Sequence, residues 1–436
     1  MVYFLMTSLG EMATYLPTSG SFSTYASRYV DPSLGFALGW NYWFNWVITV
    51  AADVELSALA ISYWEPMRVL PHWAWSLLFL VIIIGLNSLS VKVYGESEYW
   101  FALIKVVVVI VFLIVGCLTI FGILGGEYIG FKNLTVGDAP FIGEDTSLSS
   151  QILATLGVFL IAGYSFQGTE LIGITAGESE EPEKSIPKAV KQVFWRILIF
   201  YVLAILVIGL LIPYTSPDLL GAESAEEIAK SPFTIVFQNI GLGFAAMIMN
   251  VVILTSVLSA ANSGMYVSSR QLFSLSSHKY GPKMFKELNS NSVPTIALSF
   301  SSVFMVVCFI FERYNPSGYY MLLSMVGIII MIIWMTSLVS QIRLRKAIIK
   351  QGKTAEEVLP YTAKTGVVGS YIALFSFAII TILQLVSDYI TGGFLQMSYN
   401  LVCPLICLIM YITFKLVTKK KFVKLEEMNI DPYKEK

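Results

Sequence analysis

Charged residues are scarce in this chain of 436 residues. Lysine, arginine, aspartate and glutamate make up 13% of the sequence, against roughly 25% in an average soluble domain. Hydrophobic residues make up 56%, and the mean hydropathy is +0.72. This composition excludes an ordinary soluble domain and predicts an all-α integral membrane protein. The net charge of −1 gives no basis for binding nucleic acid, so we expect a lipid bilayer around the chain and no nucleic-acid partner.

Histidine and cysteine are also rare, with two and four residues respectively. Their scarcity bears on catalysis and on metal binding. His72 lies at a predicted membrane boundary and His278 in a predicted loop. The four cysteines lie in apolar segments without metal-ligand spacing: Cys117, Cys308, Cys403 and Cys407. Buried cysteine usually behaves as a small hydrophobic residue. Because the motifs supply no nucleophile–base pair and no metal cluster, we expect neither an enzyme nor catalytic or metal-binding residues.

Long apolar runs are what the sequence does have. A helix needs about 20 mostly apolar residues to cross a bilayer, and eleven segments approach this template, the first of them visibly short. They are Val2–Tyr15, Leu34–Trp64, His72–Leu89, Phe101–Leu124, Leu153–Gly177, Val193–Ile212, Phe233–Val267, Thr295–Phe311, Tyr319–Gln341, Val367–Tyr389 and Asn400–Val417. No low-complexity linker divides them. We therefore predict a transmembrane helical domain over residues 1–418 and a tail over residues 419–436.

Basic residues are distributed unevenly between the loops. Lysine and arginine accumulate on the cytoplasmic side of membrane proteins, and one set of alternating connections, together with the tail, holds most of the 28. The opposite set has only Arg68, Lys132, Lys230 and Arg313, and its acidic residues are Asp138, Glu144, Asp145, Asp218, Glu223, Glu226 and Glu227. We therefore predict a multi-pass protein of the cell membrane with a cytoplasmic C-terminus.

The segment Leu160–Gly173 places a carboxylate, a hydroxyl and several glycines inside an apolar run of membrane length. Hydrocarbon offers no water to these groups, so an ionisable residue here usually faces a cavity. Gly163, Gly168 and Gly173 tolerate non-helical backbone angles, which favours a discontinuous helix of the kind that forms binding sites in secondary transporters. Glu170 is the main functional candidate. The alternative is a protonated acid that bonds to a neighbouring helix.

Three further polar residues interrupt predicted spans. For Asp53 we favour a position facing a cavity, against a hydrogen bond between helices. Asn262 ends a run of small residues, which is typical of close helix packing in membranes; a polar contact with a ligand is the second interpretation. Lys105 lies near the predicted cytoplasmic boundary, where a lysine most often extends its amine toward water.

The predicted number of spans is odd, which does not fit two matched repeats. Eleven spans with a cytoplasmic tail place Met1 outside the cell, at the head of a span too short to cross comfortably. Transporters built from inverted repeats need matched halves, so we expect one helix to be missing before this sequence. The alternative is a genuinely odd-numbered protein with an external N-terminus.

Short motifs of one kind follow each other along nearly the whole chain. They are Ser8–Pro17, Ser19–Phe22, Gly39–Trp43, Glu98–Lys105, Phe166–Glu170, Ala176–Ser179, Ile186–Val190 and Ser259–Tyr266. In this order they resemble amino acid permeases of the amino acid–polyamine–organocation superfamily, and their pattern is most similar to that of the lysine-specific permeases. Such permeases begin with a cytoplasmic tail and a first helix with a Gly-rich break, and this sequence contains neither.

The resemblance implies a LeuT-type bundle of inverted repeats, with eleven of the usual twelve transmembrane helices in this sequence. It also implies alternating access driven by a proton gradient, with the proton as coupling ion and no other cofactor. The substrate would be lysine or another cationic amino acid. The implied substrate-binding residues are Ser165, Phe166, Gly168, Thr169, Glu170, Glu178, Asp53 and Asn262. Lys105 would serve proton coupling, because proton-coupled members place a fifth-helix lysine where sodium-coupled relatives bind an ion.

Several alternatives stay open at this point. Phe166 is either an aromatic wall of the site or ordinary packing, and Glu178 is either a site residue or a solvated surface acid. The whole protein is either a transporter, an amino acid sensor that reports to a regulatory membrane partner, or an inactive truncated remnant. A channel is disfavoured, because a single broken-helix site suits stepwise exchange better than a continuous pore.

Overall fold

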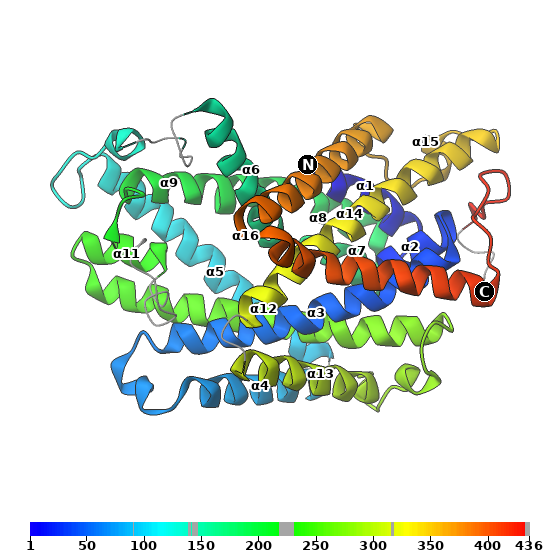
Figure 1. The fold of residues 1–436 in the computed structure, drawn as a ribbon, viewed down its shortest axis with the longest axis horizontal. Coiled ribbons are helices and arrows are strands. Elements are labelled where there is room, and N and C mark those ends of the chain that lie inside the picture. Colours follow the sequence, from blue (N-terminus) through cyan, green and yellow to red (C-terminus); the bar gives the residue numbers. More distant parts are fainter. Residues whose placement is uncertain (90, 138–140, 142–146, 218–230, 315–317, 432–436) are drawn as a thin grey trace.

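The computed structural model describes residues 1–436 except 90, 138–140, 142–146, 218–230, 315–317 and 432–436. Within the described residues every regular element is a helix. The longer helices are α3 (Pro32–Ile61), α4 (His72–Leu89), α5 (Val91–Ile120), α12 (Gly243–Ser277), α13 (Thr295–Tyr314), α14 (Gly318–Lys350) and α16 (Gly366–Thr418). Most of them run along the long axis of the molecule (Figure 1).

Shorter helices connect or flank these. The α-helices among them are α1 (Val2–Tyr15), α2 (Ser21–Tyr29), α6 (Leu148–Ser165), α7 (Leu171–Thr175), α8 (Pro182–Arg196), α9 (Ala204–Leu211), α11 (Pro232–Asn239) and α15 (Ala355–Val358). Single tighter turns form η1 (Glu65–Val69), η2 (Lys132–Thr135), η3 (Ala176–Glu178) and η5 (Lys283–Lys286). The wider, π-helical η4 (Ile197–Leu203) joins α8 to α9.

Eight helical segments in the described part of the chain are long and apolar enough to cross a membrane. They coincide with eight of the predicted spans; one of them, Pro182–Leu211, combines α8, η4 and α9. The other three predicted spans correspond to α1, to the pair α6 and α7, and to the apolar part of α13, Thr295–Phe311, all of which are short or interrupted. The prediction of an all-α, multi-pass membrane protein is confirmed, and the count of eleven stays a prediction.

Two predicted segments have the wrong bounds. The predicted span Phe233–Val267 is two helices, because the chain turns between α11 and α12 at Gly241, whose φ is +79°. Helix α12 then continues past Val267 to Ser277, since its polar last turns are buried against protein rather than exposed to lipid. The last two predicted spans follow each other without a loop in α16, where Gly393 (φ 66°, ψ −163°) marks a kink between them.

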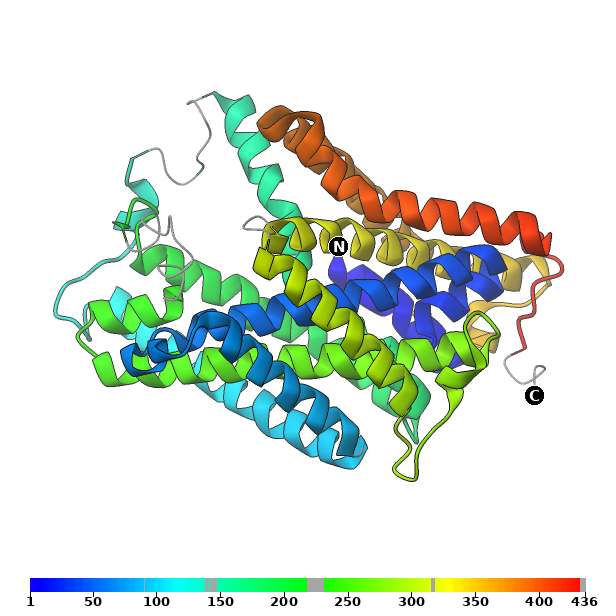
Figure 2. The same cartoon turned by 60° about the horizontal axis from the view of Figure 1, so that its bottom comes forward.

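Helix α3 lies in the middle of the bundle and packs against α2, α4, α12, α13, α14 and α16. In both ribbon views α3 and α12 run side by side (Figures 1 and 2). Their contact is close at Gly264 of α12, where an added Cβ would lie 2.6 Å from Val50 and 2.9 Å from Trp46. Gly264, two residues after the run of small residues that ends at Asn262, therefore serves close helix packing.

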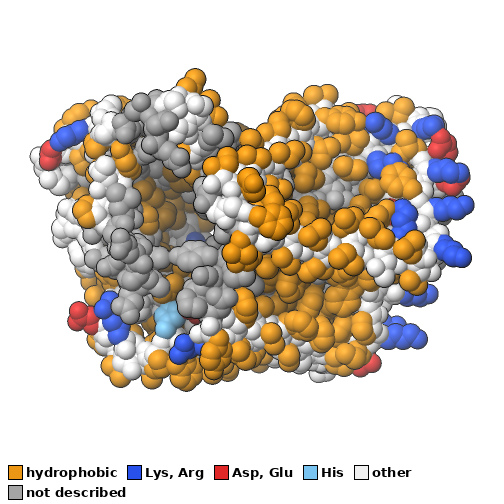
Figure 3. Space-filling view, viewed as in Figure 1, with side chains coloured by type: hydrophobic (Ala, Val, Ile, Leu, Met, Phe, Trp, Pro, Cys, Tyr) orange, Lys and Arg blue, Asp and Glu red, His pale blue; other side chains and the backbone are white. Residues whose placement is uncertain are grey.

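Lysine and arginine side chains gather at one end of the molecule (Figure 3). This is the end where α2, α15 and the C-terminus lie (Figure 1), and we call it the basic end. Residues after α16 pack onto it: the Val423 amide donates to the Val30 carbonyl (2.9 Å), and the Gln351 amide donates to the Met428 carbonyl (2.9 Å). The acidic residues predicted for the opposite loops lie outside the described residues: Asp138, Glu144, Asp145, Asp218, Glu223, Glu226 and Glu227.

Candidate functional site

The chain leaves its helical path between α6 and α7. Helix α6 ends at Ser165, α7 begins at Leu171, and Gly168 between them has a φ of +96°. This backbone region is costly for a residue with a Cβ, so glycine suits the position. Thr169 closes the turn locally, because its hydroxyl donates to the Phe166 carbonyl (2.9 Å). The predicted discontinuous helix is confirmed.

The other two glycines predicted to loosen this segment have different positions. Gly163 lies inside α6 and Gly173 inside α7. Gly173 is needed for close packing, since an added Cβ would lie 2.5 Å from the hydroxyl of Ser21 and 3.1 Å from Leu9. The break therefore depends on Gly168 alone among the three.

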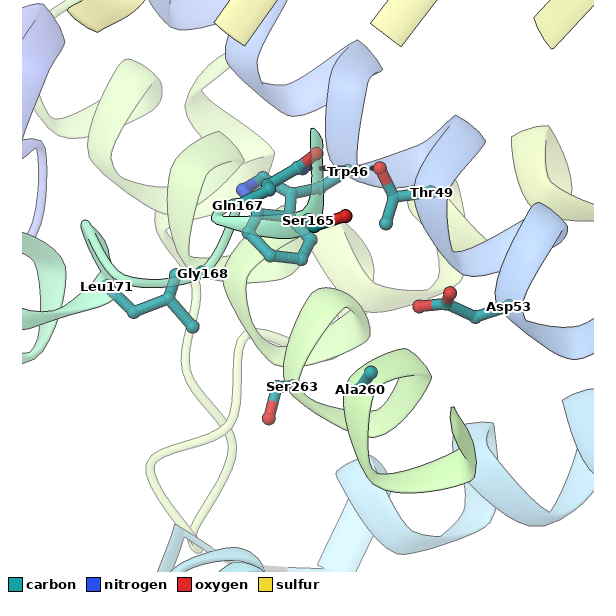
Figure 4. Close-up of a pocket in the computed structure, with 9 residues that line it drawn as sticks. All are labelled: Trp46, Thr49, Asp53, Ser165, Gln167, Gly168, Leu171, Ala260 and Ser263. Carbon is teal, nitrogen blue, oxygen red and sulfur yellow. Dashed lines mark hydrogen bonds between the residues drawn. The ribbon is translucent and has the colours of Figure 1, made fainter. Parts of the chain in front are cut away.

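A cavity of about 320 Å³ lies beside the break, within the size range of small-molecule sites. Three structures line it (Figure 4): α3, the α6–α7 break and α12. The lining residues are Trp46, Thr49, Asp53, Ser165, Gln167, Gly168, Leu171, Ala260 and Ser263. The structure thus brings together three predicted site residues, namely Asp53, Ser165 and Gly168.

Two groups in this cavity are suited to a positively charged ligand. The Asp53 side chain extends from α3 toward the space between α3 and α12 (Figure 4), and the residue is 9% exposed. Gln167 donates from Nε2 to Asn45 Oδ1 (2.6 Å) and to Thr49 Oγ1 (3.3 Å). These bonds direct its amide, while its buried Oε1 has no hydrogen-bond partner among the described residues. A carboxylate and an unsatisfied amide oxygen both accept hydrogen bonds from an ammonium group.

Glu170 lies next to the cavity but does not line it. It is fully buried, its Oε2 accepts from the Gly168 amide (3.0 Å), and its Oε1 accepts from the Tyr42 hydroxyl of α3 (3.4 Å). The carboxylate therefore stabilises the turn at Gly168 and also connects the break to α3. This is the arrangement of the alternative interpretation, a carboxyl group bonded to a neighbouring helix.

Phe166 faces away from the polar cavity. Its ring stacks on Tyr201 of η4 with the centroids 4.5 Å apart, and the Tyr201 hydroxyl donates to the Ser165 carbonyl (3.0 Å). Phe166 also lines a second, mostly apolar cavity of about 360 Å³, together with residues of α1, α8, η4, α14 and α16. Its side chain thus supports the break from behind.

Glu178 ends η3, and its side chain lies outside the described residues. Glu170 precedes α7, and Glu178 ends the tighter turn that follows α7, so the two acids do not belong to one uninterrupted helix. Gly177, one residue earlier, packs against the backbone of Ser19, which places this turn near α2.

Asn262 and Lys105 belong to a second polar cluster, which lies on the face of α12 next to the one that lines the cavity. Lys105 Nζ donates to Ser259 Oγ (2.8 Å), and Ser259 Oγ donates to Glu98 Oε2 (2.8 Å). Asn262 Nδ2 donates to Glu98 Oε1 (3.0 Å), and its own Oδ1 accepts from Asn87 Nδ2 of α4 (2.8 Å). Lys105 therefore bonds within the protein rather than extending toward water.

Two acids inside the bundle were not predicted from the sequence, namely Glu98 and Glu11. Glu98 is half-buried and holds the cluster on α12, and the rule applied to Glu170 would have singled it out as a carboxylate entering an apolar run. Glu11 of α1 is fully buried and pairs with Arg345. Glu55, which the sequence left unassigned, pairs with His72 (Nδ1 to Oε1, 3.0 Å) at the far end from the basic end.

Comparison with known proteins adds a family. Residues 1–427 match the family described as amino acid permease. The chain is 48% identical to the lysine-specific permease LysP of Lactococcus lactis over 100% of the chain and 84% of that protein, and 48% identical to LysP of Escherichia coli over 98% and 86%. It is 45% identical to the histidine permease HisP of Lactococcus lactis over 99% and 88%.

Solved structures agree on the fold. A manganese transporter of Eremococcus coleocola has a TM-score of 0.50 to this chain at 14% identity, covering 96% of the chain and 85% of that protein. A histidine-to-alanine mutant of that transporter gives 0.51 at 14% identity, with 95% and 85% covered. At this identity the likeness concerns the fold alone, and these transporters have the LeuT-like fold that the sequence predicted.

Proposed function

The chain belongs to the amino acid permease family, and we propose that it imports lysine across the cell membrane by alternating access, driven by a proton gradient. Family membership makes it a transporter rather than an enzyme. Two relatives named as lysine-specific permeases match the chain almost from end to end, which supports lysine as the substrate. The histidine permease relative makes histidine the natural competitor to test.

The position of Asp53 on the cavity is the single observation that carries the choice of a cationic substrate. A carboxylate inside the hydrocarbon region costs at least roughly 2.5–3.5 kcal/mol, and a ligand cation reduces that cost by pairing with it. We assign the side-chain ammonium of lysine to Asp53. Gln167 Oε1, unsatisfied among the described residues, is a second acceptor on the same cavity.

The broken helix supports binding of the amino acid backbone. Helix α6 ends at Ser165, and the carbonyls of an unwound segment accept from an α-ammonium group. We propose that Ser165 and Gly168 contact the substrate here, and that Glu170, Phe166 and Thr169 hold the shape of the break. Glu178 is proposed as a site residue from the sequence resemblance, whereas Asn262 belongs to the cluster with Glu98 rather than to the cavity.

Lys105 is proposed as the proton-coupling residue. Its amine is half-buried, and its charge interacts with those of Asp53 and Glu98. A lysine in such surroundings can release and regain a proton within a cycle. Since Asp53 also lines the cavity, the same carboxylate senses both the substrate and the coupling lysine.

The orientation follows from charge. The basic end carries the connections rich in lysine and arginine together with residues 419–431 (Figures 1 and 3). Cytoplasmic ends of membrane proteins are enriched in these residues. We therefore propose that the C-terminus is cytoplasmic and that the protein lies in the cell membrane.

Uptake into proteoliposomes tests the proposal. Labelled lysine should accumulate when an inward proton gradient is applied, a protonophore should abolish the accumulation, and excess unlabelled lysine should compete better than histidine. Accumulation that is indifferent to the protonophore would contradict proton coupling. Failure of unlabelled lysine to compete would contradict the substrate assignment.

A further inference from the structure

Lys105 and Glu98 are joined through the hydroxyl of Ser259. The two charged residues lie on α5 about two helical turns apart and therefore on one face. Ser259 comes from the facing helix α12 and stands between them, with 2.8 Å to Lys105 Nζ and 2.8 Å to Glu98 Oε2. A hydroxyl has one donor and two acceptor positions, so Ser259 accepts from the amine and donates to the carboxylate at the same time.

Side-chain amide groups hold the Glu98 carboxylate, which is the acceptor in this series of hydrogen bonds. Asn262 donates to the second carboxylate oxygen of Glu98 (3.0 Å), and Asn87 of α4 in turn donates to Asn262 (2.8 Å). Ser259 and Asn262 are each only 1% exposed. Helix α12 therefore holds both oxygens of the Glu98 carboxylate through two different residues, and α4 supports one of these, Asn262.

We propose that Ser259 relays a proton between Lys105 and Glu98 during transport, an inference that rests on the proposed proton coupling. In the forward step the Lys105 ammonium gives a proton to Ser259 Oγ, and Ser259 gives its own hydroxyl proton to Glu98 Oε2. The products are a neutral amine, an unchanged serine and a neutral carboxylic acid. Two protons each move across one hydrogen bond, the net transfer is one proton from Lys105 to Glu98, and the reverse step restores both charges.

The poorly solvating membrane interior favours this proton transfer. Two opposite charges become two neutral groups, which removes the cost of keeping ions in a poorly solvating region. The other titratable group facing Lys105 is Asp53 of α3. When a lysine substrate neutralises Asp53 in the cavity, the Lys105 ammonium loses part of its electrostatic support, and the proton moves toward Glu98.

The relay is also placed to respond to the cavity. Ala260 and Ser263 of α12 line the cavity, and each follows directly after a residue of the cluster, Ser259 and Asn262. One stretch of α12 therefore presents two adjacent faces, one to the cavity and one to α5. A shift of α12 during alternating access changes both donor–acceptor distances at Ser259.

Substitutions at Ser259 test the relay with two transport assays in proteoliposomes. One assay measures lysine accumulation driven by a proton gradient, and the other measures exchange of labelled for unlabelled lysine without a gradient. Ser259→Ala removes the hydroxyl and should lower the rate of gradient-driven uptake by about 100-fold, the lower end for a positioned proton-transfer group. Exchange should remain, and Ser259→Thr, which keeps a hydroxyl, should restore gradient-driven uptake.

Ser268→Ala is the matched control. Ser268 is a buried serine of the same helix whose hydroxyl donates to the Met265 carbonyl (2.9 Å), and both assays should match those of the wild type. Glu98→Gln is the second variant, because the glutamine amide is of similar size but is not protonated in the pH range of transport. It should lose gradient-driven uptake while keeping exchange.

The outcomes separate the relay from the proposed function. If wild-type uptake is gradient-driven and Ser259→Ala retains it, the relay is wrong and the proposed function stands. If Ser259→Ala and Glu98→Gln lose exchange together with gradient-driven uptake while still binding lysine, the cluster serves the conformational change itself and the relay is overturned. If wild-type uptake needs no proton gradient, the proposed coupling fails and the relay fails with it.

Discussion

Glu11 and Asp53 are both carboxylates buried in the helical bundle, and their surroundings are opposite. Glu11 is 0% exposed; its Oε2 accepts from Arg345 Nε (3.0 Å) and Gln341 Nε2 (2.6 Å), and its Oε1 accepts from the Ala363 amide. Asp53 is 9% exposed and lines a cavity of about 320 Å³. The protein supplies the partners of Glu11, whereas the cavity leaves space for a partner of Asp53.

This difference separates structural from functional acids in a membrane protein. A buried charge is retained when it is paired and hydrogen-bonded, and Glu11 meets this condition through α14 and the backbone before α16. The network extends further, since Ser370 of α16 donates to Gln341 Oε1 (2.8 Å) and contacts Ser8 of α1 (2.8 Å). Glu11 therefore fixes the bundle near the basic end, and Asp53 is the acid that we propose for a ligand.

The largest expected effect is on stability, at Glu11. Glu11→Gln leaves the Arg345 guanidinium without its charged partner, and breaking a buried ion pair from one side costs about 3–5 kcal/mol. We expect a large fall in the thermal unfolding temperature of the purified protein in detergent. An unfolding temperature unchanged from that of the wild type would contradict the structural role of Glu11. The contrast between Glu11 and Asp53 would then fail.

The second effect is on binding, at Asp53. Asp53→Asn keeps the side-chain volume and removes the charge, so lysine should lose about 1.5–3 kcal/mol of binding free energy, the range for hydrogen bonds to charged groups. The unfolding temperature should change little. Asp388→Asn is the matched control, because Asp388 is a buried acid of α16 bonded to Gln384 and Asn400; it should bind lysine as the wild type does.

The third effect is on the break between α6 and α7. Gly168→Ala places a Cβ where nothing lies within 4 Å, so the cost is the backbone strain at φ +96°, about 1–3 kcal/mol. Lysine uptake should fall together with stability. Gly85→Ala is the control: this glycine of α4 also has open space around it but lies in an ordinary helix, where alanine is the better helix former. Equal behaviour of the two variants would contradict a strained break.

The smallest effect concerns the ion pair between Asp31 and Lys415 at the basic end (2.5 Å). Burial alone would raise the pKa of Asp31, but hydrogen bonds from Lys415 and Ser33 outweigh it and hold the pKa below its usual value. Such a carboxylate stabilises the fold above its unfolded-state pKa, about 3.9, and the stabilisation is lost as the pH falls through the lower folded-state pKa.

Asp31→Asn tests this pair while keeping an N-cap side chain for α3, because asparagine caps helices as well as aspartate does. The loss near neutral pH should be less than about 1 kcal/mol, since the lysine is partly exposed and screened by solvent. The difference from the wild type in unfolding temperature should shrink between pH 5 and pH 3, a window set by the lowered pKa of Asp31 and the linkage relation. A difference that grows toward acid pH would reverse the sign and refute the assignment.

Much of the architecture could be predicted from the sequence, because apolar length alone decides which segments cross a bilayer. The bounds of α1 and α4 agree with the predicted spans. The break was predicted from Gly163, Gly168 and Gly173 beside polar residues, and of these only Gly168 lies in it. The separation of α11 from α12 was missed even though Gly241 and Gly243 flank the turn. Hydropathy stays high across that turn and conceals it.

The site was predicted less completely, since side-chain direction depends on packing. Asp53 faces the cavity as favoured. Glu170 was the main functional candidate, but its carboxylate points back to Gly168 and Tyr42, because the turn at Gly168 directs it away from the cavity. Gln167 lines the cavity and was not singled out, and Ser259 gained its importance only when α5 and α12 were seen to face each other.

Calorimetric measurements of lysine and norleucine binding to the wild type and to Asp53→Asn in detergent decide whether Asp53 pairs with the lysine side chain. Norleucine lacks only the side-chain amine of lysine. We expect the wild type to prefer lysine by about 1.5–3 kcal/mol, and Asp53→Asn to lose this preference while binding norleucine nearly as the wild type does. If Asp53→Asn still prefers lysine by the same amount, Asp53 is not the partner of the lysine side chain.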